Sequence, residues 1–177
     1  MKLISSEERN HLLSQIARDA FHLELRDDYH VPKEEDPYTA WLRGEPDDQE
    51  WMRPWLDMIR ALTGNGRTVR RVRVVSEPLT SYIRFEHEGT HDNIAAGEDI
   101  RWLPRHRLPA ELKMPLDGAD WWLCDDQYLA VGHFDADGRV LGSEIVTDPE
   151  TVAECIRVRD ELWAMAIPHE AYTPRLS

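Results

Sequence analysis

The middle of the chain carries the feature that most restricts its fold, a strand, a helix and a second strand in succession. Residues 69–75 consist only of valine and arginine, and valine favours a pleated strand. An apolar stripe at helical spacing then runs from Leu79 to Phe85, behind a Ser-Glu-Pro sequence typical of a helix start. A second apolar run, Ile100 to Leu103, ends at a proline. This order predicts a βαβ unit with two parallel strands and a right-handed crossover.

Tight turns predict antiparallel strands in the following segment. The runs 121–124 and 128–134 flank Asp125 and Asp126, and the run 140–146 follows a second turn that contains aspartate and glycine. Adjacent residues of a strand point to opposite faces, so Trp121 and Trp122 cannot share a layer. We expect one indole to meet a C-terminal helix and the other to meet N-terminal helices, which requires a sheet covered on both faces.

A capped helix is expected near the C-terminus. Asp148 is a favourable N-cap, and Pro149 suits the first helical position. The expected buried stripe of this helix contains Val152, Cys155, Ile156, Arg159, Leu162, Trp163 and Ala166. From Pro168 onward the sequence shows no periodic pattern, so a loose tail is expected. Cys124 and Cys155 are interpreted as buried thiols.

The first 66 residues are expected to be mainly helical. A helix is predicted from Ser5 or Ser6 to about Asp19, and residues 21–26 suit a short strand. The charged segment 27–36 is interpreted as a connector, with further helices around Trp41 and across 51–62. The predicted fold class is therefore mixed α/β. A helical N-terminal region, 1–66, packs on an α/β domain, 67–177, that holds the βαβ unit, the hairpins and the C-terminal helix in one compact unit.

The net charge of the chain argues against binding to nucleic acid or to anionic membranes. The chain has 34 acidic and 21 basic residues and a formal net charge of −13, which repels nucleic acid and anionic lipid. No apolar run approaches the roughly 20 residues of a membrane helix, and the N-terminus lacks the apolar core of a secretory signal. We expect a cytoplasmic protein that binds neither nucleic acid nor membrane directly. Arg71 and Arg73, in the basic stretch 67–73, are expected to pair with the surplus carboxylates.

Two groups of residues suggest metal chemistry and have simpler explanations. His87, Glu88 and His91 match the spacing of a zinc protease helix, but Gly89 disfavours that helix and no third ligand follows at the expected spacing. Asp125 and Asp126 lie where oxygen ligands could gather, yet aspartate also favours turns through local hydrogen bonds. We therefore predict no metal site and no cofactor.

The segment from 69 onward resembles a phospholipase D-like half-domain. The resemblance lies in the order of elements and in short phrases, namely 96–101, the hairpin at Asp125 and Asp126, 142–144, and 148–150 before the last helix. That family uses a His-x-Lys-x4-Asp motif, with His as nucleophile and Lys as a stabiliser of phosphoryl oxygens. If Asp125 or Asp126 takes the Asp position, the His position falls on Gly118 or Ala119, and the Lys position on Asp120 or Trp121. The resemblance therefore implies a degenerate, inactive copy.

The whole chain also resembles an actinobacterial family of unknown function that is often encoded beside helix-turn-helix regulators. The phrases that carry this resemblance are 23–26 with Tyr29, 70–78, 95–98, 101–103, 121–125, 134–135 and Gly138. The resemblance implies a regulatory setting and a protein partner, for which a helix-turn-helix regulator is a candidate.

The functional prediction is a non-catalytic regulatory or interaction protein that acts with a transcriptional regulator or binds a small ligand. Expected contact residues are Arg71, Arg73, Trp102, Trp121, Asp125 and Asp126. The alternative is a hydrolase or biosynthetic tailoring enzyme with a pocket of histidines and carboxylates, for which the candidates are His87, Glu88, His91 and His133. The sequence makes no prediction of oligomeric state.

Overall fold

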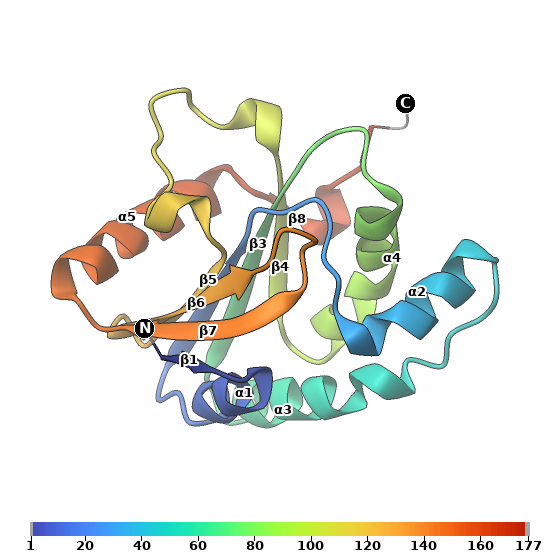
Figure 1. Ribbon diagram of the computed structural model, residues 1–177, viewed down its shortest axis with the longest axis horizontal. Helices are drawn as coiled ribbons and strands as arrows, with labels where there is room; N and C mark the ends of the chain where they lie inside the picture. The colour runs from blue at the N-terminus through green and yellow to red at the C-terminus, as the bar shows by residue number, and fades with distance from the viewer. Residues whose placement is uncertain (1, 176–177) are drawn as a thin grey trace.

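An eight-stranded mixed sheet runs through the structure, in the order β1-β7-β6-β5-β2-β3-β4-β8 (Figure 1). The computed structural model describes residues 2–175. The strands are β1 (Leu3–Ile4), β2 (Asp19–Glu24), β3 (Thr68–Val75), β4 (Asp99–Pro104), β5 (Trp121–Cys124), β6 (Tyr128–Phe134), β7 (Val140–Val146) and β8 (Ile167–Pro168). The α-helices are α1 (Ser6–Ser14), α2 (Glu35–Leu42), α3 (Arg53–Gly64), α4 (Ser81–Ala95) and α5 (Pro149–Met165). The mixed α/β fold class is confirmed.

The predicted βαβ unit is β3, α4 and β4. β3 and β4 pair in parallel, with Val72 opposite Arg101. The helix begins later than expected, because Thr80 is its N-cap and accepts a hydrogen bond from the Ile83 N–H at 3.1 Å. It also continues through Gly89 to Ala95, since its packing against the sheet outweighs the low helix propensity of a single glycine.

The hairpins and the capped C-terminal helix are confirmed. β5, β6 and β7 pair antiparallel in sequence order. Three residues, 125–127, connect the paired Cys124 and Tyr128 between β5 and β6, and Asp125 at φ 53° and Asp126 at φ 58° occupy the left-handed region in this turn. Asp148 caps α5 by accepting a hydrogen bond from the Thr151 N–H at 2.9 Å. The sequence pattern near these turns therefore predicted both topology and turn chemistry.

The N-terminal region holds the three expected helices, and its expected short strand is β2, which lies near the centre of the sheet. β2 pairs in parallel with β3 and antiparallel with β5. Its Phe21 and Leu23 are fully buried on one face, while His22 and Glu24 point to the other. The first helix ends at Ser14 so that the chain can enter this strand. Segments from both sides of residue 66 thus share one sheet, and the boundary at 66/67 stays a prediction.

The two faces of the sheet differ in composition. α5 packs on one face over an apolar core that includes Trp121, Val72 and Leu162. On the other face, α1 and α3 cover a cluster around Trp122, and α4 covers a separate cluster around Trp102. Figure 1 shows α5 to the left of the sheet, with α3 below it and α4 and α2 to the right. The prediction that Trp121 and Trp122 meet different helices is confirmed.

The C-terminal segment is ordered against the sheet, which corrects the expectation of a loose tail. β8 pairs with β4, and a 3-10 turn (His169–Ala171) follows it. Tyr172 is buried and its ring stacks on Trp102 with 5.5 Å between centroids. The buried tyrosine supplies the energy that holds this segment in place. Within residues 2–175, none of the helices combines the length and the apolar character needed to cross a bilayer.

We predict that Leu162→Ala destabilises the fold more than Trp163→Ala. Leu162 is fully buried, whereas Trp163 is half-buried, with its ring against Phe21 and under the Arg101 guanidinium at 3.9 Å. Chemical denaturation should show losses of about 2–5 kcal/mol for Leu162→Ala and about 1–3 kcal/mol for Trp163→Ala. The exposed Glu161→Ala serves as a control. A Trp163→Ala protein as stable as wild type would mean that this indole does not stabilise α5.

Candidate functional site

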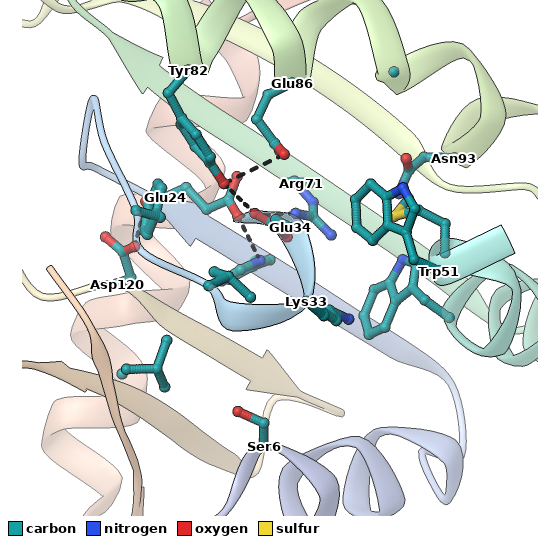
Figure 2. Close-up of a pocket in the computed structure, with 18 of the residues that line it drawn as sticks. Ser6, Glu24, Lys33, Glu34, Trp51, Arg71, Tyr82, Glu86, Asn93 and Asp120 are labelled. Carbon is teal, nitrogen blue, oxygen red and sulfur yellow. Dashed lines mark hydrogen bonds and ion pairs between the residues drawn. The ribbon is translucent and has the colours of Figure 1, made fainter. Parts of the chain in front are cut away.

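A cavity of about 660 Å³ opens on the sheet face opposite α5 (Figure 2). Its floor carries side chains from β2, β3 and β5, and its walls come from α1, α4, the segment 29–34 and the segment 45–55. Figure 2 shows Tyr82 and Glu86 entering from α4 and Ser6 from α1 on the opposite side. The cavity therefore lies between the two apolar clusters of this face.

The floor of the cavity is a buried network of arginines and glutamates. Arg71 Nε lies 2.7 Å from Glu98 Oε1, and Arg71 Nη1 lies 2.9 Å from Glu24 Oε1. Arg73 Nε lies 3.0 Å from Glu24 Oε2, and Arg73 also pairs with Glu86. Although burial opposes its ionisation, Arg73 and Arg71 lower the pKa of Glu24 to about 2. The expectation that these arginines pair with carboxylates is confirmed.

Glu98 reaches Arg71 because of the backbone at Gly97. Gly97 has φ +110°, and a Cβ at this position would lie 2.4 Å from Thr63 Oγ1. The fully buried Glu98 carboxylate also accepts a hydrogen bond from Asn93 Nδ2 at 2.9 Å. The turn after α4 thus brings a carboxylate under the sheet arginines.

His22 adds a neutral aromatic ring to the floor. Burial lowers the pKa of His22 well below its ordinary value. The imidazole stacks on Trp122 with 4.1 Å between centroids, and the Arg71 guanidinium lies 5.7 Å from the same indole. Planar groups can therefore stack on the floor as well as hydrogen-bond to it.

Two carboxylates in the upper cavity share one phenol. Tyr82 Oη donates a hydrogen bond to Glu34 Oε2 at 2.6 Å and lies 3.4 Å from Glu86 Oε1 (Figure 2). Burial and the nearby Glu86 charge raise the pKa of Glu34 to about 7. Glu34 therefore changes its charge near neutral pH.

Asp120 is a second acidic group with an altered pKa. Its carboxylate accepts hydrogen bonds from the Leu25 N–H at 2.8 Å and from Tyr29 Oη at 2.5 Å. Burial dominates these contacts and raises the pKa of Asp120 to about 6. Figure 2 shows Asp120 on the side of the cavity away from Trp51.

Aromatic rings line the wall between α2 and α4. Phe85 lies at their centre, with Trp41, Trp51 and Tyr38 at centroid distances of 6.0, 6.3 and 5.5 Å. The Trp41 Nε1–H donates to Glu88 at 2.6 Å, and the Trp51 Nε1–H donates to Asp47 at 2.9 Å. Carboxylates thus fix the orientation of both indoles.

The histidines considered for catalysis are dispersed. Glu88 and His91 line the cavity, but His91 is 71% exposed and its Nδ1 lies 2.6 Å from the Glu88 carbonyl. His87 packs against Trp102 and His169, and His133 Nε2 lies 3.1 Å from Glu144 on another part of the sheet. The candidate histidines therefore do not share one pocket: His91 and Glu88 lie at the cavity, whereas His87 and His133 lie elsewhere. Within residues 2–175, no three His, Cys, Asp or Glu side chains gather in a metal-binding arrangement.

Some of the other predicted contact residues lie at the cavity, and the rest hold elements of the fold together. Arg71 and Arg73 line the cavity, whereas Trp121 borders it from β5 with its indole in the core under α5. Trp102 is fully buried, and its Nε1–H donates to His169 Nδ1 at 3.0 Å. Asp125 accepts hydrogen bonds from the N–H groups of 17, 18 and 19 at 2.7–3.0 Å. Asp126 pairs with Arg159 of α5. Both aspartates lie in the predicted turn, but their carboxylates bond to distant segments instead of locally, so they fasten the turn to the start of β2 and to α5.

Sequence reasoning missed Glu24 and Glu34, and it considered Asp120 only as a turn carboxylate and as the residue at the lysine position of the phospholipase D motif. Glu34 lies in the segment interpreted as a connector, which instead forms a 3-10 turn (Pro32–Glu34) leading into α2. The one available signal for Glu24 was the alternation in 21–24, which places His22 and Glu24 on one face beside the arginines of the next strand. No local pattern identified Glu34.

We predict that Asp120→Asn changes how stability depends on pH. The pKa of Asp120 is raised above its ordinary 3.8 to about 6, so its stabilising protonated form is lost as pH rises from about 4 to 7. Relative to Asp120→Asn, wild type should lose about 2 kcal/mol of unfolding free energy between these pH values. Chemical denaturation at pH 4 and pH 7 measures the difference, with the exposed Asp137→Asn as control. A constant difference between wild type and Asp120→Asn would contradict the assignment.

Comparison with solved structures supports the fold. NucT from Helicobacter pylori superposes with a TM-score of 0.51 at 10% sequence identity. The match covers 94% of this chain and 96% of NucT. At this identity the likeness establishes a similar arrangement of strands and helices. No curated protein matches the sequence significantly. The family profile described as domain of unknown function (DUF6879) matches residues 7–174, and the chain therefore belongs to this family.

Proposed function

We propose that this protein binds a small ligand in the cavity above β2, β3 and β5 and acts as a non-catalytic regulatory protein. The observation that carries the proposal is the cavity itself, about 660 Å³ in volume and lined by tryptophans and buried charges. Ligand sites are typically concave, of this size, and mostly aromatic with a few oriented polar groups. Arg71 and Glu24 are held by several partners each, so the floor is organised before any ligand arrives.

A degenerate phospholipase D-like framework fits this role. In one register of that family's motif, Asp120 occupies the position of the Lys and Gly118 that of the His nucleophile. Asp120 lines the cavity, where its carboxyl cannot stabilise phosphoryl oxygens as a lysine does. We infer that the cavity retains binding capacity without phosphoryl transfer.

A protein partner completes the proposal. The resemblance of the sequence to a family encoded beside helix-turn-helix regulators favours such a regulator as the partner, and the −13 net charge disfavours direct DNA contact. We infer that ligand binding changes the affinity for this partner.

An enzyme is the second candidate, and one observation favours it. Glu34, with a pKa raised to about 7 by burial and by Glu86, has the proton affinity that suits a general acid or base at neutral pH. A hydrolase or tailoring enzyme could use this carboxyl with Asp120. Turnover of a ligand, abolished by Glu34→Gln, would favour this candidate over pure binding.

The proposal predicts that protein isolated from its natural host carries a small molecule. Native mass spectrometry should show a mass above that of the chain, and denaturing should release the ligand. Trp51→Leu should reduce the bound fraction severalfold because it removes a wall of the cavity. Trp163→Leu, on the opposite sheet face, is the matched control and should retain the ligand. Protein without any bound molecule, and without thermal stabilisation by a metabolite extract, would refute the proposal.

A further prediction is that the protein does not cleave phosphodiesters. Neither Gly118 nor Asp120 can supply the nucleophile or the cation of the family reaction. Fluorogenic phosphodiesters and a phosphatidylcholine vesicle should remain intact at micromolar protein. Cleavage that disappears on a single substitution in 118–126 would show that this interpretation is wrong.

A further inference from the structure

The residues that line the cavity carry an excess of negative charge. The acidic residues are Glu7, Glu24, Glu34, Glu45, Asp47, Glu86, Glu88 and Asp120, and the basic ones are Arg9, Lys33, Arg71 and Arg73. Eight carboxyl groups therefore face four Lys and Arg side chains. The whole chain, at −13, adds a field of the same sign. The charge of the lining residues and the net charge of the chain therefore both disfavour the entry of an anionic ligand.

The floor arginines are already neutralised. Arg71 is paired with Glu98 and Glu24, and Arg73 with Glu24 and Glu86. An anion could reach either guanidinium only by displacing a buried carboxylate, which would then lose its partner. Arg9 lies on α1, where its guanidinium hydrogen-bonds to the Asn10 side chain. Contact with the floor arginines would therefore bring an anion little favourable binding free energy.

The Glu34 carboxylate is the opposite case, since Glu86 beside it is already paired with Arg73. Both lie beside the Tyr82 hydroxyl, and within residues 2–175 no Lys or Arg nitrogen lies within 4.0 Å of the Glu34 carboxylate. Two carboxylates in one desolvated site repel each other, and Glu34 responds by holding its proton up to a pKa of about 7. A cation between them would remove this repulsion.

Aromatic rings stand beside this carboxylate pair. Tyr82 and Phe85 lie 6.3 Å apart on α4, and Trp41 and Trp51 each lie about that far from Phe85. The indole N–H groups of both tryptophans are bonded to carboxylates, and the Arg84 guanidinium already lies 5.9 Å from the Trp41 ring centroid, so this wall attracts a cation. Aromatic faces with nearby carboxylates attract ammonium groups and offer little to anions.

We propose that the ligand is an organic cation, an amine or a quaternary ammonium ion, whose charge lies between the Glu34 and Glu86 carboxylates and the neighbouring aromatic rings. This inference rests on the proposed ligand-binding function and names the chemical class for that cavity. Arg73, which pairs with Glu86, holds that carboxylate in place below the cation. Binding displaces the Glu34 proton, so the site gains a negative charge as it receives a positive one.

Calorimetric titration with matched probes tests the inference. Choline and spermidine are the cations, 3,3-dimethylbutan-1-ol is the neutral isostere of choline, and inorganic phosphate is the anion. We expect choline to bind at least about tenfold more tightly than the neutral alcohol, and phosphate not to bind. Glu34→Gln should weaken choline about tenfold and leave the alcohol unaffected. Glu35→Gln, an exposed neighbour with the same change of charge, is the control and should bind like wild type.

The pH dependence of binding provides a second readout. Tyr82 and Glu86 from α4, Lys33 from its own turn and Arg73 from β3 all act on Glu34. Because Glu34 loses its proton near pH 7, choline affinity should rise about tenfold from pH 6 to pH 8. The rise should vanish in Glu34→Gln and persist in Glu35→Gln.

The outcomes separate this inference from the proposed function. If the molecule that co-purifies is anionic or neutral, or if the neutral alcohol binds as tightly as choline, the cation inference is overturned and ligand binding stands. If both cations fail while a co-purified ligand is present, the inference also fails. If no ligand co-purifies and no probe binds, the proposed function itself fails.

Discussion

The buried ion network of Arg71 and Arg73 with Glu24, Glu98 and Glu86 determines how the helix-rich face of the sheet is built. Charges in a low-dielectric interior require partners close by, and one strand cannot supply them all. β2 therefore contributes Glu24, the turn after α4 contributes Glu98, and α4 contributes Glu86. The order of the strands and the position of α4 both satisfy this network. Because apolar groups cannot solvate it, the network separates the cluster around Trp122 from that around Trp102, and the cavity lies between them.

Local patterns in the sequence were sufficient to predict the parts of the fold that depend on neighbouring residues. The turn aspartates 125 and 126, the Asp148 cap and the βαβ order all follow from rules that act over a few positions. The pairing of Arg71 and Arg73 with carboxylates was also predictable, since arginines on a strand face must be solvated or paired. The identity of those carboxylates was not, because Glu24 and Glu98 lie 47 and 27 residues away from Arg71 in the sequence.

The cavity itself had no signal in the sequence. Glu34 and Asp120 belong to irregular segments, so no periodicity assigns them to a face or a layer. Their function depends on burial, which only the packing of α2, α4 and the segment 29–34 creates. The pattern His87, Glu88 and His91 shows the opposite limit, since a motif with correct spacing on a real helix leaves His91 exposed. The spacing of residues along a helix determines which way their side chains point. The packing of neighbouring elements then determines whether a side chain contacts a partner.

β3 shows how the fold separates stability from binding. Its Val72 and Val74 face the apolar core under α5, where close packing supplies most of the stabilising energy. Its Arg71 and Arg73 face the cavity, where buried charge brings little net stability. Apolar and charged side chains thus alternate along β3. Apolar residues on this face would stabilise the fold at least as well as the buried charges do. The presence of the charged network therefore indicates that this face of β3 serves a function other than stability.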